Sequence, residues 1–137
     1  MDTTISIQEA LVYVMVIMSA SDNSMTDSEL AKIGDIAKSL PVFANYDAAN
    51  VLPAAQRCGE RLQSETGLSD VLALIADVLP VHLYDTAYAL GVEVAAADLG
   101  VSPEELRVLQ LLRDRFNLDK LTTAAIERGA IARFKRG

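Results

Sequence analysis

The sequence contains a single cysteine and a single histidine, and this scarcity excludes several kinds of site. Cys58 has no partner for an intramolecular disulfide, and Cys58 with His82 cannot supply the ligands of a structural zinc site. A chain without disulfides is typical of a reducing compartment, so we expect a cytoplasmic protein. No set of acid, base and nucleophile can be assembled either, and the sequence therefore predicts that the protein is not an enzyme.

Basic residues and phosphate-binding motifs are also scarce. The chain has 12 Lys and Arg against 19 Asp and Glu, which gives a net charge of −7. Because binding to nucleic acid relies on clustered Lys and Arg, we expect no nucleic-acid partner. The patterns G-x-x-x-x-G-K-[ST], G-x-G-x-x-G and G-x-S-x-G do not occur, so nothing supports a nucleotide-binding or serine-hydrolase function.

Long hydrophobic runs are missing as well. The most apolar stretch, ALVYVMVIM at 10–18, is too short to span about 30 Å of hydrocarbon, and Asp2 and Glu9 do not fit the basic start of a signal peptide. We therefore expect a soluble protein. Its expected partners are other proteins. The C-terminal segment is basic, with Arg128, Arg133, Lys135 and Arg136. A helix C-terminus favours cations, which explains this cluster without any partner. The alternative is that these residues make a peripheral contact with acidic lipids.

What the chain does contain is a helical pattern. Only four prolines and seven glycines occur in 137 residues, while Ala and Leu recur throughout. A chain of this length with 51% apolar residues can bury a sizeable core, so residues 1–137 are predicted to form one all-α domain. We expect a compact bundle of about seven helices, over 6–20, 26–40, 45–65, 70–79, 81–97, 102–116 and 118–134.

Local signals set the expected helix boundaries. The first helix is apolar nearly all round, which predicts a buried, central position. Pro53 either kinks the helix at 45–65 or begins a second one. Gly67 is the expected C-cap of that segment, and Ser69 is the expected N-cap of the next helix.

The chain carries an internal repeat at an offset of 76 residues. The stretch SDNSMTDSEL at 21–30 matches ADLGVSPEEL at 97–106, so that Asp22 corresponds to Asp98 and Glu29 to Glu105. The apolar residues that follow also correspond, as with Ile33 and Leu109. The repeat predicts two similar helix–loop–helix halves, in which the helices before Asp22 and Asp98 form a central pair.

The repeated glutamates have an ordinary structural explanation, but the aspartates do not. Glu29 and Glu105 have the spacing of a capping box behind Thr26 and Ser102. Asp22 and Asp98 follow a helix, where a negative charge opposes the helix dipole by about 0.3–1 kcal/mol. The short connection between the two helices could bring this aspartate and the glutamate seven residues later face to face. Two such carboxylates repel each other unless they share a proton or a cation. An EF-hand is excluded, because its glycine and its last glutamate would fall on Asp27 and Ile33.

These residues resemble a known family. The Ala-Asp pattern with an apolar residue three positions later and a Glu seven positions later is similar to the TerB-like tellurite-resistance family, most closely over GVEVAAADLGVSPEELRVLQLLRDRF. The likeness runs from Met15 to about Arg133. The family usually has Gly directly after the Asp, where this chain has Asn23 and Leu99.

The resemblance implies an all-helical domain linked to tellurite and other chemical stress. It also implies a divalent cation bound by acidic residues, which in this sequence are Asp22, Glu29, Asp98 and Glu105. Oxygen ligands without nearby His or Cys favour Ca²⁺ or Mg²⁺ over Zn²⁺, and waters or backbone carbonyls must complete the coordination.

Two functional hypotheses follow. The first is a non-enzymatic, cytoplasmic stress-response module that binds this cation. The alternative is a helical adaptor that has no metal site and holds another protein in a groove near Tyr84 and Tyr88, although aromatic residues at that spacing usually pack into the core.

Overall fold

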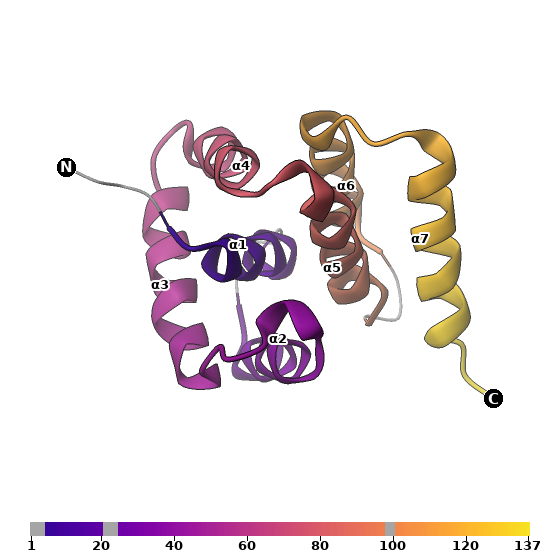
Figure 1. Cartoon of the computed structure of the whole chain (residues 1–137), viewed down its shortest axis with the longest axis horizontal. Coiled ribbons are helices and arrows are strands. Elements are labelled where there is room, and N and C mark those ends of the chain that lie inside the picture. The colour runs from indigo at the N-terminus through magenta and orange to yellow at the C-terminus, as the bar shows by residue number, and fades with distance from the viewer. Residues whose placement is uncertain (1–4, 21–24, 98–100) are drawn as a thin grey trace.

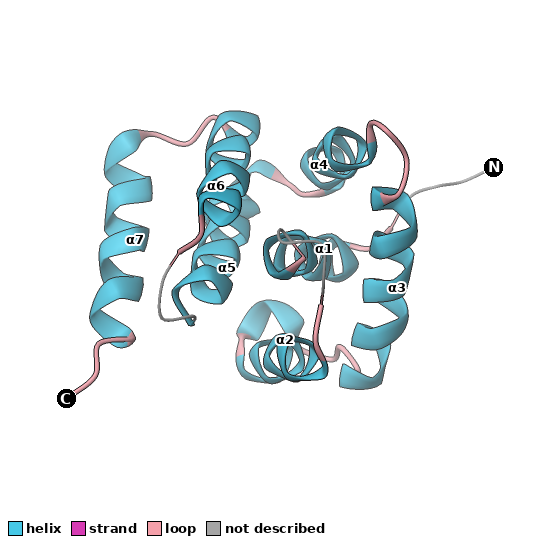
Figure 2. Ribbon diagram, turned by 180° about the vertical axis from the view of Figure 1, so that it is seen from behind, coloured by secondary structure: helices cyan, strands magenta, loops and turns pink. Residues whose placement is uncertain are grey.

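The computed structural model describes residues 5–20, 25–97 and 101–137, and within them it confirms an all-α bundle without strands (Figures 1 and 2). Three short 3-10 helices connect the longer elements: η1 (Pro41–Phe43), η2 (Ala48–Asn50) and η3 (Val81–Leu83). The described residues form seven α-helices, which are α1 (Ile7–Ser19), α2 (Asp27–Ser39), α3 (Val51–Leu62), α4 (Gly67–Val78), α5 (Tyr84–Ala97), α6 (Pro103–Phe116) and α7 (Lys120–Arg133).

Helix α1 is the centre of the bundle, as its apolar sequence predicts. Every residue from Ala10 to Ser19 is buried, because α2, α3, α4 and α5 pack around it (Figure 1). A helix that is apolar on all sides loses the most surface to water when other helices surround it. In the described part of the chain no single helix is long and apolar enough to cross a membrane; the pair Gly67–Val78 and Val81–Ala97 reaches the required length and composition only together, bent by 117°.

Helices α1 and α5 form the predicted central pair, and a glycine sets their close approach. A Cβ placed on Gly91 of α5 would lie 3.5 Å from Val14 Cγ1 and 3.7 Å from Met18 Cε of α1. It would also lie 3.2 Å from Leu112 Cδ1 of α6. Gly91 is therefore the point where α1, α5 and α6 come together.

Side-chain caps fix the first turns of α2 and α6. Thr26 and Ser102 each accept a hydrogen bond from the backbone N–H of the glutamate three positions later, and that glutamate accepts one in return. Both predicted capping boxes are confirmed. At the start of α1, Ser6 accepts a hydrogen bond from the backbone N–H of Glu9, but Glu9 does not complete a capping box. Its carboxylate binds Tyr13 and Arg57 instead.

Some predicted boundaries are wrong. Gly67 does not end a helix but begins α4, and Ser69 lies inside the first turn of α4 instead of capping it. The reason is a close approach between consecutive helices, because a Cβ on Gly67 would lie 2.6 Å from the carbonyl oxygen of Leu62 at the end of α3. Pro53 lies in the first turn of α3, so it begins a helix and does not kink one.

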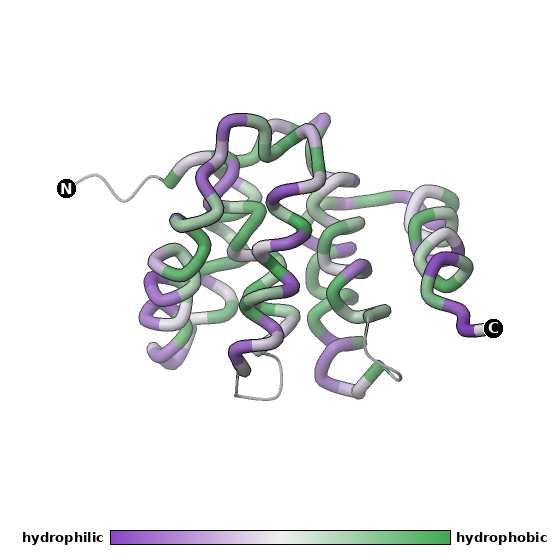
Figure 3. The backbone as a smooth tube through the Cα atoms, turned by 90° about the horizontal axis from the view of Figure 1, so that it is seen from below, coloured by the Kyte–Doolittle hydropathy of each residue, from purple (hydrophilic) through white to green (hydrophobic). Residues whose placement is uncertain are grey.

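Helix α7 lies at the edge of the bundle (Figure 3). It packs mainly on α5, and only Thr123 and Ala130 of its residues are buried. Asp119 caps its first turn through the backbone N–H of Thr122. The last helix is thus attached to one side of the central pair and exposes most of its surface.

The packing at Gly91 leads to a first prediction. Replacing Gly91 with Leu should destabilise the protein by about 1–3 kcal/mol or more, because the added atoms force α1 and α5 apart. The matched control is Gly59→Leu in α3, where an added Cβ meets nothing within 4 Å; it should gain about 0.5–1 kcal/mol from helix propensity alone. Urea unfolding of both variants measures the difference, and equal stabilities would show that the central pair does not need this glycine.

Candidate functional site

The two repeated glutamates occupy equivalent positions at the N-termini of α2 and α6. Glu29 Oε1 accepts the backbone N–H of Thr26 at 2.7 Å, and Glu105 Oε1 accepts that of Ser102 at 2.9 Å. Glu105 is only 6% exposed, whereas Glu29 is partly exposed. Each carboxylate therefore uses one oxygen for its cap, and the two glutamates differ in their access to solvent.

The other two residues of the predicted metal site, Asp22 and Asp98, lie outside the described residues. Among the residues that are described, no group of three or more His, Cys, Asp or Glu side chains gathers in a way that could hold a metal ion. The set of Asp22, Glu29, Asp98 and Glu105 stays a prediction from the sequence.

A first cluster of charged and phenolic groups joins α1 to α3. The hydroxyl of Tyr13 donates to Glu9 Oε2 at 2.7 Å, and Arg57 donates to both oxygens of Glu9 at 2.9 and 2.8 Å. The hydrogen bonds from Arg57 hold the pKa of Glu9 below its usual value. Burial, together with the bond to Glu9, raises the pKa of Tyr13 to about 12.

A second cluster of the same composition joins α5, α6 and α7. Tyr88 is fully buried, and its hydroxyl donates to Glu127 Oε2 while it accepts a bond of 2.9 Å from Arg113. Arg113 also pairs with Glu127 at 3.1 Å. Burial, and then the bond to Glu127, raises the pKa of Tyr88 to about 12. Sequence reasoning missed this cluster, because Tyr88 and Glu127 lie 39 residues apart and no local pattern connects them.

This second cluster borders an apolar groove of about 210 Å³ between α5, α6 and α7. We call this site the α5–α7 groove. Apart from Arg113 and Glu127 its lining is apolar, and it consists of Val92, Ala95, Ala96, Val101, Leu106, Leu109, Ala130 and Ile131. The apolar lining suits apolar side chains better than a polar metabolite.

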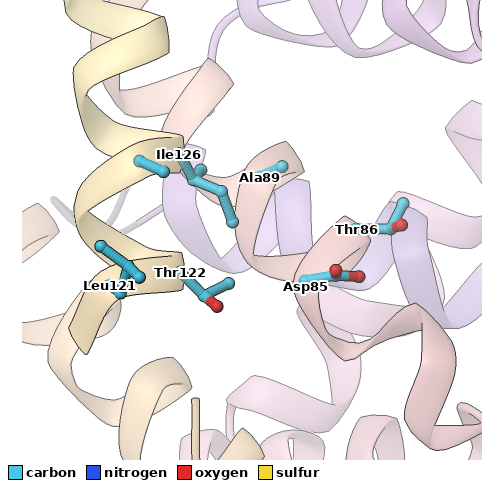
Figure 4. Close-up of a pocket in the computed structure, with 7 residues that line it drawn as sticks. Asp85, Thr86, Ala89, Leu121, Thr122 and Ile126 are labelled. Atoms are coloured by element: carbon cyan, nitrogen blue, oxygen red, sulfur yellow. The ribbon is translucent and has the colours of Figure 1, made fainter. Parts of the chain in front are cut away.

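A larger hollow of about 480 Å³ lies between α5 and α7 and is open to solvent. Figure 4 shows Thr122 and Ile126 of α7 opposite Asp85 and Ala89 of α5. Asp85 is the only charged side chain that lines it, so this hollow has neither the converging ligands of a metal site nor paired catalytic groups.

The remaining candidates from the sequence behave as core residues. Tyr84 stacks on Phe116 with ring centroids 4.7 Å apart, and its hydroxyl donates to Ala76 O. Neither Tyr84 nor Tyr88 lines the α5–α7 groove. Cys58 is fully buried, and this burial raises the pKa of its thiol to about 12. A thiol in that state is a poor nucleophile.

Comparison with known proteins gives one positive result. The family model described as Tellurite resistance protein TerB matches residues 8–128, which include most of α1 and the first half of α7. No curated protein and no solved structure matches the chain.

The buried hydroxyl of Tyr88 leads to a second prediction, about stability at alkaline pH. Unfolded tyrosine loses its proton near pH 10, whereas the pKa of folded Tyr88 is about 12. The unfolded state therefore releases this proton first, and the parent protein should lose stability as the pH rises from about 10 toward about 12. Tyr88→Phe should cost about 1–2 kcal/mol at neutral pH but show a shallower alkaline loss.

Urea unfolding at several pH values tests this expectation. Tyr13→Phe is the matched variant and should also show a shallower alkaline loss of stability. The pKa of Tyr13 is likewise about 12, and its hydroxyl likewise donates to a carboxylate that is paired with an arginine. An alkaline loss in Tyr88→Phe as steep as in the parent would show that Tyr88 does not contribute to it.

Proposed function

Because this chain belongs to the TerB family of tellurite-resistance proteins, we propose that it is a non-enzymatic stress-response module that binds a divalent cation at two acidic corners. The corners are Asp22 with Glu29, and Asp98 with Glu105. The proposal includes a cytoplasmic location, where the single thiol stays reduced.

The observation that carries this proposal is the equivalent placement of Glu29 and Glu105. Both are fixed as the third residue of the helix that follows a helix of the central pair in the sequence. Because each cap uses Oε1, the second oxygen of each carboxylate lies outside the cap. With Asp22 and Asp98 they would supply only oxygen ligands, the set that Ca²⁺ and Mg²⁺ prefer. Waters or backbone carbonyls would complete the coordination, so we expect a modest affinity.

A non-enzymatic role is supported by the state of the reactive side chains. Cys58 is buried with a raised thiol pKa, and His82 is exposed on η3. The tyrosines of raised pKa are engaged in structural clusters that join helices.

Cation binding is the third prediction. Calorimetric titration with Ca²⁺, Mg²⁺, Mn²⁺ and Zn²⁺ should show binding of Ca²⁺ or Mg²⁺ to the parent, with a rise in thermal stability. The double variant Asp22→Asn/Asp98→Asn should lose both effects, because it removes charge and leaves both capping boxes intact. Asp35→Asn/Glu60→Gln removes the same charge from exposed positions on α2 and α3 and should bind like the parent.

Two results would contradict the cation site. The first is a parent protein without heat of binding for any of the four ions. The second is equal stabilisation of the parent and the Asp22→Asn/Asp98→Asn variant, which would mean that the ion binds elsewhere.

A second candidate function is a protein adaptor, and the α5–α7 groove favours it. Leu106 and Ile131 border this groove and are 57% and 50% exposed. Exposed apolar side chains around an apolar depression are typical of a surface that receives a partner helix. An adaptor function of this kind would not require a bound cation.

The adaptor function gives a fourth prediction. A protein captured from stressed cells by the parent should be lost with Leu106→Asp, because a carboxylate in the groove would have to be desolvated on binding. Leu52→Asp is the control, since Leu52 is 52% exposed on α3 and does not line the groove. Equal capture by both variants, or no capture by the parent, would argue against this groove as the docking site.

A further inference from the structure

The charges of the chain are divided unevenly along the sequence. Residues 118–137 carry five Lys and Arg against two Asp and Glu, whereas residues 1–117 carry seven against seventeen. The last helix is thus a basic segment attached to a strongly acidic body. Such a molecule offers complementary charges to a second copy of itself.

One face of α7 is already used inside the molecule. Thr123 and Ala130 are buried against the bundle, Glu127 binds Tyr88, and Arg133 binds Glu93 of α5. These contacts account for the two charged residues on the inner side of the helix.

The opposite face of α7 is apolar and basic, and no acidic residue lies on it. Leu121 is 80% exposed and Ile131 is 50% exposed. The same face carries short side chains and one cation, all of them exposed: Ala124, Ala125, Arg128 and Ala132. A row of alanines allows another helix to approach closely, and Arg128 in its middle favours a partner that carries carboxylates.

The outer face of α4 has the complementary composition. Asp70, Ala73 and Asp77 are exposed, and their spacing places them on one stripe of the helix. The opposite side of α4, with Val71, Leu72 and Ile75, is buried in the core. Helix α4 contains no Lys or Arg, so its outer face carries carboxylates only.

These two faces cannot meet within one molecule. Helices α5 and α6 lie between α4 and α7 (Figures 1 and 2), and both outer faces are exposed to solvent. We propose that the outer face of α7 docks on the outer face of α4 of a second copy of this chain. The interface is independent of the cation site, and of the outer-face residues of α7 only Ile131 also lines the α5–α7 groove.

The spacing of the residues suits an antiparallel arrangement of the two helices. With Arg128 above Ala73, its guanidinium reaches the carboxylates of Asp70 and Asp77, each about one turn away along α4. Leu121 lies seven residues before Arg128, and Val81 lies eight residues after Ala73. Seven residues correspond to about 10 Å along α7, whereas Val81 lies beyond the end of α4, as the first residue of η3. An antiparallel α7 would bring Leu121 to the C-terminal end of α4, after which Val81 follows; these two side chains are 80% and 75% exposed.

A second copy fits this face better than an anionic membrane does. A helix that lies in a lipid surface separates a broad apolar face from a basic one. In α7 the apolar residues occur on both sides, with Ile126 facing the core and Leu121 facing solvent. The acidic body would also be repelled by anionic lipid headgroups. The carboxylates on the outer face of α4 match the basic face of α7 without these penalties.

Sedimentation equilibrium tests the proposal as the fifth prediction. The parent should associate with rising concentration, and added salt should weaken the association because exposed ion pairs are screened. Arg128→Glu and Asp77→Arg should each weaken it at least tenfold. An equimolar mixture of the two variants should associate again, because Arg128 of one variant meets Asp77 of the other. Circular dichroism confirms that each variant is folded.

The matched controls reverse exposed charges away from both faces. Arg115→Glu on α6 and Asp35→Arg on α2 should leave the association of the parent unchanged. A parent that stays monomeric at all concentrations overturns the proposal, and so does a mixture of Arg128→Glu and Asp77→Arg that fails to associate. Binding of the parent to phosphatidylserine vesicles that is lost in Arg128→Glu, without self-association, assigns the face to a membrane instead.

Discussion

The contact of α1 with α5 around Gly91 is the constraint on which the rest of the molecule depends. A Cβ at this position would already press on Leu112 at 3.2 Å, so the two central helices and α6 are as close as a glycine allows. Because α1 is buried from Ala10 to Ser19, the helices around it are fixed by what this one helix presents to them. The two halves of the repeat are joined at this contact, and each half places its next helix, α2 or α6, through a capping box that follows from local sequence alone.

The outer helices are fixed to this central pair by two clusters of the same composition. In each, a buried tyrosine of a central helix donates its hydroxyl to a glutamate that is paired with an arginine. Exposed ion pairs of this kind contribute little by themselves, about 0–1 kcal/mol. The tyrosine changes this, because its buried hydroxyl needs a partner and therefore fixes where the charged pair must lie. Tyr13 orients α3 through Arg57, and Tyr88 orients α6 and α7 through Arg113 and Glu127.

What the sequence could predict depended on how local each signal is. The helices, the central position of α1 and both capping boxes follow from periodicity and from residues three positions apart, and the structure confirms them. The assignment of Gly67 as a C-cap was wrong, because that glycine is required by the end of α3 lying against the start of α4. The cluster at Tyr88 and the α5–α7 groove were not predictable, because they need residues from three helices that no local pattern connects. For the candidate site, the capping role of Glu29 and Glu105 was predictable for the same reason that the helices were.

Capping and cation binding make opposite electrostatic demands on those glutamates. The N-terminus of a helix favours a carboxylate and disfavours a cation by about 0.3–1 kcal/mol, so Glu29 and Glu105 alone would be poor ligands. The end of the preceding helix has the reverse preference, and the sequence places Asp22 three residues after the last residue of α1 and Asp98 directly after α5. An aspartate there is unfavourable alone and becomes favourable once a cation accompanies it. Binding of the cation would therefore depend on the aspartates, whereas the glutamates would keep their capping hydrogen bonds whether or not a cation is bound. Replacing the aspartates, and not the glutamates, therefore distinguishes a cation-binding site from a pair of helix caps with no bound ion.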